Sequence, residues 1–71
     1  MDTINKPHIS LTAARVNAGL NQKEMAVEMG VDVSTIINWE KGKTEPSASQ
    51  LRRISKISRI PMDFIFIPMK S

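Results

Sequence analysis

Glycines divide the first part of the chain into segments that are too short for long helices. They stand at positions 19, 30 and 42, and each directly follows a segment with helical periodicity. A glycine just after such a pattern is typical of a helix end, because it can adopt the left-handed conformation there. The spacing therefore predicts several short helices that must share one core.

The length and the missing cysteines restrict how such a core can be stabilised. The chain has 71 residues and no cysteine, so we expect one domain without disulfides or a cysteine-based zinc site. A domain of this size buries only about 60% of the surface of its unfolded chain. Stability must therefore come from efficient apolar packing or from oligomerisation.

The same composition argues against several classes of function. With one histidine, no clustered carboxylates and no phosphate-binding glycine loop, we expect neither an enzyme nor a metal site, and no cofactor. No apolar run approaches the roughly 18 residues of a membrane-spanning helix, and the first residues do not resemble a signal peptide. We expect a cytoplasmic protein with no membrane contact and no small-molecule ligand.

Basic side chains are concentrated in one part of the chain. Residues 1–40 hold three basic and five acidic side chains, whereas residues 41–59 hold six basic ones and a single acidic one, Glu45. Such a segment is either the electrostatic footprint of phosphate binding or a solvated helix face. The composition alone leaves both interpretations open.

Periodicity and capping residues predict an all-α fold of five short helices. Asn21 with Glu24 forms a capping box, and Ser10, Asp32 and either Ser47 or Ser49 are further N-caps. Strand-like alternation is suggested only over Phe64–Ile67. We expect an N-terminal arm at 1–9, a domain at 10–67 with a helix-turn-helix at 22–41, and a tail at 68–71. The expected helices cover residues 11–18, 22–29, 33–41, 48–58 and 62–66.

The twenty residues from 22 to 41 meet the demands of a helix-turn-helix together. Ala26 is small where a second helix approaches, Gly30 can take the positive φ of a sharp turn, and Val31 can tuck its side chain beneath both helices. Such a motif places its second helix in the major groove of DNA. The apolar contacts are expected from Met25, Met29, Ile36 and Trp39.

These residues resemble the Cro/C1-type (XRE) helix-turn-helix family over roughly residues 10–66. The resemblance implies a lambda-repressor-like domain of five helices that binds an operator in double-stranded DNA and regulates transcription. It suggests a repressor of the phage, prophage or mobile-element type. The matching positions are Leu20–Ala26, Gly30, Val31, Ile36, Trp39–Gly42 and Pro46.

The third helix is expected to read DNA bases with the side opposite Ile36. Asn38 can pair with adenine, Ser34 can bond several base edges, and Val33 and Ile37 can contact thymine methyl groups. The alternative for Val33 and Ile37 is packing against a neighbouring segment, such as the C-terminal tail.

A second group of residues is expected to contact phosphates. The family uses the glutamine that matches Gln22 in this way, at a helix start where the dipole favours an anion. The loop after the third helix is another phosphate contact of the family. Basic residues of the fourth helix could follow the backbone or form a solvated face. The expected phosphate contacts are Asn21, Gln22, Lys23, Lys41, Lys43 and Thr44, and the undecided basic residues are Arg52, Arg53, Lys56 and Arg59.

The resemblance also implies a structural ion pair between Arg15 and Glu40. Glu40 falls beside Ile36 on the inward side of its helix, where an unpaired carboxylate would be costly. Trp39 is also expected in the core, because it lies on the same inward side of the helix as Ile36.

The apolar segment Phe64–Met69 must partly close the core over the first and fourth helices. Its remainder could form a homodimer contact, on DNA alone or also without it, because one such module reads few base pairs. The alternative function is an antitoxin or another protein-interaction module of the same fold, which would bind its partner through this segment.

Overall fold

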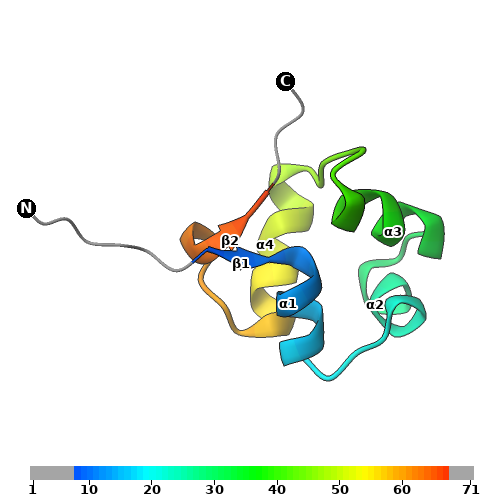
Figure 1. The fold of residues 1–71 in the computed structure, drawn as a ribbon. Helices are drawn as coiled ribbons and strands as arrows, with labels where there is room; N and C mark the ends of the chain where they lie inside the picture. Colours follow the sequence, from blue (N-terminus) through cyan, green and yellow to red (C-terminus); the bar gives the residue numbers. More distant parts are fainter. Residues whose placement is uncertain (1–7, 68–71) are drawn as a thin grey trace, which may run out of the picture.

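Polar caps and glycines set the bounds of the helices in the computed structural model, which describes residues 8–67. The four N-caps are Ser10, Asn21, Asp32 and Ser47, and each accepts a hydrogen bond from a backbone N–H of the following turn. Ser47, rather than Ser49, is therefore the N-cap of the fourth helix. The helices are α1 (Leu11–Asn17), α2 (Gln22–Met29), α3 (Val33–Lys41) and α4 (Ala48–Ser58) (Figure 1).

The expectation of a fifth α-helix over residues 62–66 is wrong. The segment contains a short 3₁₀ helix, η1 (Met62–Phe64), followed by strand β2 (Ile65–Phe66). A β-branched residue and an aromatic one favour an extended backbone, and Pro68 in the sequence disfavours a helical conformation at Ile67. The described fold therefore has four α-helices and a small strand pair.

That strand pair joins the two ends of the described chain. Strand β1 (Ile9–Ser10) runs parallel to β2, with Ile9 opposite Ile65 and Ser10 opposite Phe66. Ile9 was expected in the N-terminal arm, but it is paired and packs against the core. The remainder of the expected arm, residues 1–7, and the expected tail, residues 68–71, lie outside the described residues.

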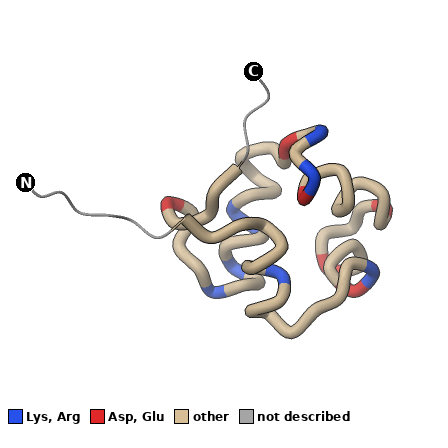
Figure 2. Tube along the Cα trace, in the orientation of Figure 1, with Lys and Arg blue, Asp and Glu red and all other residues tan. Residues whose placement is uncertain are grey.

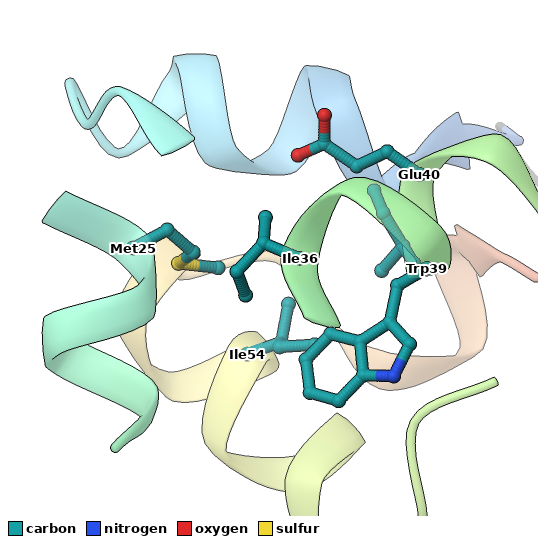
Figure 3. A pocket seen from close by; sticks show the side chains of 6 residues that line it. Met25, Ile36, Trp39, Glu40 and Ile54 are labelled. Carbon is teal, nitrogen blue, oxygen red and sulfur yellow. The ribbon is translucent and has the colours of Figure 1, made fainter. Parts of the chain in front are cut away.

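All four helices contribute to one apolar core. In Figure 1, α1 and α4 lie together beside the strand pair, and α2 and α3 form the other side of the bundle. Ile36, Trp39 and Ile54 meet between these halves and are each at most 4% exposed. They border a cavity of about 10 Å³ (Figure 3), which holds at most one water molecule. No helix among residues 8–67 is long and apolar enough to cross a membrane.

The turn between α2 and α3 has the local geometry that the sequence predicts. Gly30 ends α2 in the left-handed region with φ 69°. The N–H of Val31 donates to the carbonyl of Ala26 over 3.0 Å, and the Val31 side chain packs against the core. Two helices thus meet at a turn of three residues, with small Ala26 buried at their approach.

Arg59 holds a strained conformation at the end of α4, and this yields a stability prediction. It adopts φ 61° and ψ 27°, the left-handed region that favours glycine. Since a side chain there costs about 1–2 kcal/mol, we expect Arg59→Gly to raise the free energy of unfolding by about 0.5–1 kcal/mol after the entropy of glycine is subtracted. Urea unfolding measures this. Lys56→Gly, inside the same helix, should instead lose about 1 kcal/mol; equal losses at both sites would contradict the account.

Candidate nucleic-acid interface

The carboxylate of Glu40 joins three helices at the inner side of α3. Arg15 of α1 donates to it twice, from Nε to Oε2 over 2.7 Å and from Nη2 to Oε1 over 3.3 Å. Gln22 of α2 donates from Nε2 to Oε1 over 3.0 Å. Arg15 also donates from Nη1 to the carbonyl of Leu20 over 3.0 Å. In Figure 3, Glu40 points towards α1 while the indole of its neighbour Trp39 lies against α4.

Hydrogen bonds keep Glu40 ionised despite its burial. Its side chain is 8% exposed, and such burial on its own raises the pKa of the carboxyl group. Hydrogen bonds from Arg15, Gln22 and Thr12, together with the charge of Arg15, outweigh this effect and hold the pKa of Glu40 below its ordinary value of 4.5. The paired carboxylate therefore stays charged at neutral pH and links α3 to α1 and α2.

The residues expected to read bases do not all lie on the open side of α3. Val33 is half-buried and packs against the core, which is the alternative that the sequence left open for it. Ile37 is also half-buried, but it is not one of the residues that pack against the core. Asn38 is half-buried, and its side-chain amide has no hydrogen-bond partner among residues 8–67. Ser34 is exposed.

Ser34 already uses its hydroxyl proton within the protein. Its Oγ donates to Oδ2 of Asp32 over 2.6 Å, and its backbone N–H donates to the same oxygen over 2.9 Å. These side-chain and backbone hydrogen bonds hold the pKa of Asp32 below its ordinary value, so Asp32 is a charged acceptor at neutral pH. The Ser34 oxygen consequently presents its lone pairs to solvent.

The expected phosphate contacts lie at the start of α2 and after α3. Asn21 is exposed, but its Oδ1 caps α2 by accepting from the N–H of Glu24 over 2.7 Å. Lys23 is exposed, whereas Gln22 is half-buried and donates to Glu40. Lys23 is therefore the cation of this first turn that is exposed and available to a phosphate.

The loop that follows α3 is held against the end of that helix. Gly42 ends α3 with φ 79°, and the carbonyl of Asn38 accepts from the N–H of Lys43 over 2.9 Å. The side chains of Lys41, Lys43 and Thr44 are exposed. These donors thus lie at the end of the helix that carries Ser34 and Asn38, or directly after it.

The comparisons with known proteins agree with this geometry. A family model described as helix-turn-helix matches residues 11–65. The chain belongs to the helix-turn-helix family of the Cro/C1 type. Uncharacterized HTH-type transcriptional regulators of Sinorhizobium medicae (strain WSM419) and Rhizobium meliloti (strain 1021) are each 33% identical to it over 52 residues. This aligned part is 73% of the chain and 37% of each relative, and no solved structure is significantly similar.

Membership in this family defines the class of protein. Proteins of the Cro/C1-type helix-turn-helix family bind DNA and are not enzymes. The chain spans little more than a third of the length of the curated relatives that it matches.

Basic residues of α4 form a separate surface of this Cro/C1-type domain. Figure 2 shows the basic positions of α4 apart from those at the end of α3. Arg53 donates from Nε to the carbonyl of Glu28 over 3.0 Å and so ties α4 to the end of α2. An open groove borders this surface, and its lining residues are Ser49, Arg52, Arg53, Ser55, Lys56 and Met62.

The sequence did not reveal several residues that make polar contacts inside the bundle. Thr12 contributes to the lowered pKa of Glu40, which no local pattern indicates, because the two residues are far apart in the chain. Ser58 is 2% exposed and donates to the carbonyl of Ile54 over 2.7 Å, while Asn17 donates to the carbonyl of Ser58 over 3.1 Å. The helical spacing of Ser58 from Leu51 and Ile54 was a usable signal for its burial.

The lowered pKa of Glu40 predicts a pH-dependent stability. Its ionised form is favoured in the fold, so this contribution is complete above the ordinary pKa and is lost as the pH falls through the lower folded pKa. We expect Glu40→Gln to reduce the free energy of unfolding by about 2 kcal/mol at pH 7, and by much less at pH 3. Urea unfolding at both pH values measures the difference.

Glu45→Gln is the matched control for this experiment, since Glu45 is exposed in the loop before α4. It should leave the stability unchanged at pH 7. A loss from Glu40→Gln that is the same at pH 7 and pH 3 would show that the ionised carboxylate does not link the helices.

Proposed function

We propose that the chain is a cytoplasmic repressor that binds an operator in double-stranded DNA through the open side of α3. The observation that carries this proposal is the division of α3 into two sides. Ile36, Trp39 and Glu40 are held within the bundle, whereas Ser34, Ile37 and Asn38 keep polar or apolar groups available. This is what a helix that enters the major groove requires.

Three side chains of α3 are assigned to base edges. The free amide of Asn38 suits the N6 and N7 atoms of adenine, and Ile37 suits a thymine methyl group. Ser34 suits an amino group of adenine or cytosine, because its proton already bonds to Asp32 and its oxygen is left as an acceptor. Val33 packs against the core, so we assign it to packing rather than to base contact.

Phosphates on either side of this groove are assigned to exposed residues of two segments. Lys23 and Asn21 lie at the start of α2, and Lys41, Lys43 and Thr44 lie around the end of α3. Contacts of this kind set the register of a protein on the duplex and do not read sequence.

We also propose that two copies bind one operator. Phe66 is 47% exposed at the edge of the strand pair, and its ring stacks on that of His8 with the centroids 5.5 Å apart. An exposed aromatic residue in this position favours self-association, and a dimer would read two half-sites about 34 Å apart. An antitoxin-like role would use the same surface for another protein.

Selection of bound duplexes from a random pool tests the proposed function. A selected site with two symmetric halves, and an affinity that falls linearly with salt on logarithmic axes, would support a DNA-binding dimer. Failure to enrich any duplex, together with affinity that does not respond to salt, would leave the protein-interaction role instead.

Asn38→Ala should weaken binding to the selected site much more than binding to random duplex. The amide discriminates one base pair, so we expect a loss of about 1–3 kcal/mol at the selected site alone. Fluorescence anisotropy with both duplexes measures this. Equal losses on the two duplexes would refute base reading by Asn38.

Lys43→Ala should weaken both duplexes to the same extent, since a phosphate contact is independent of sequence. The slope of log affinity against log salt should become shallower by about 0.9. Affinities at four or more salt concentrations give the slope, and a loss confined to the selected site would contradict a phosphate role for Lys43.

A further inference from the structure

Gln22 lies at the end of α2 that is farthest from the turn between α2 and α3. It is the first residue of α2, and its side chain bonds to Glu40 in the last turn of α3. The turn over residues 30–32 joins the opposite ends of the same helices. We propose that Gln22 is a positioning residue for DNA recognition, which acts through Glu40 by fixing the angle between α2 and α3. This role rests on the proposed function.

The distance of this hydrogen bond from the turn explains why it matters for the angle between α2 and α3. The turn is held at one end by the bond from Val31 to Ala26, and Gln22 ties the open end. Helix α2 has eight residues and is about 12 Å long. A shift of about 1 Å between α2 and α3 at the end away from the turn therefore changes the angle between the two helices by about 5°. Such a rotation displaces the base-reading side chains of α3, whereas phosphate contacts by long lysine side chains tolerate it.

The surroundings of Gln22 favour this role over a direct phosphate contact. Its side chain is half-buried, and its amide bonds to an ionised carboxylate, which makes the bond stronger than one between neutral groups. Of the donors described at Glu40, Arg15 comes from α1 and Gln22 comes from α2. Removing Gln22 therefore releases α2 from this junction and leaves α1 attached.

Two substitutions in adjacent positions test the inference. Gln22→Met keeps the length and packing of the side chain and removes the donor, and Lys23→Met removes the neighbouring exposed cation as a matched control. Affinity is measured for the selected duplex and for random duplex over a range of salt concentrations. Gln22→Ala is the second variant if the methionine prevents folding, which thermal unfolding of the free protein shows.

We expect Gln22→Met to weaken the selected duplex about tenfold, to leave random duplex unchanged, and to keep the slope of log affinity against log salt. Lys23→Met should weaken both duplexes and make that slope shallower by about 0.9. In a Glu40→Gln background, the effect of Gln22→Met on the selected duplex should be about halved, since the amide oxygen that replaces the carboxylate accepts only a weaker, neutral hydrogen bond.

The inference is overturned if Gln22→Met behaves like Lys23→Met, because that result assigns Gln22 to a phosphate. It is equally overturned if Gln22→Met has its full effect in the Glu40→Gln background. Failure of the proposed function is distinguishable from both, since it appears in the unsubstituted protein as duplex binding that is absent or insensitive to salt.

Discussion

A largely buried carboxylate that must be paired controls how the helices of this protein are arranged. Glu40 is on the inner side of α3, where its charge requires partners from other helices. Arg15 supplies two hydrogen bonds from α1, and Gln22 supplies one from α2. Apolar contacts around Ile36 fill the core, but they are not directional, so this polar junction adds the orientation that packing alone does not specify.

The proposed function rests on the side of α3 that this junction leaves open to solvent. With Glu40 and Trp39 directed into the bundle, the opposite side of α3 carries Asn38 and Ser34, whose side chains have few or no hydrogen-bond partners among residues 8–67. Exposed lysines lie at the start of α2 (Lys23) and in the loop after α3 (Lys43). In the proposed function, Asn38 and Ser34 read bases while the lysines bind phosphates on either side, which is the division of roles that DNA recognition needs.

Local signals predicted more of this molecule than non-local ones did. Capping residues and glycines place both ends of α2 and α3 and the start of α4 where the sequence predicts them, because such motifs act within a few residues. The pairing of Ile9 with Ile65 joins segments that are distant in the chain, and no local pattern specifies it. A fifth helix was expected because the pairing of β2 with the distant strand β1 leaves no local signal. The bond between Gln22 and Glu40 was not expected, because these residues are also far apart in the chain. Helical periodicity also leaves residues at the border of a face undecided, as the packing of Val33 shows.

The most direct test of the account is the map of backbone amides that respond when duplex DNA is added. Two-dimensional ¹H–¹⁵N NMR spectra during a titration with the selected duplex give this map for each residue. The account predicts the largest shifts over residues 33–38, with further shifts at 21–23 and 43–44 and small ones along α4. Shifts concentrated on α4 or on the strand pair, with α3 unchanged, would contradict the claim that α3 enters the groove.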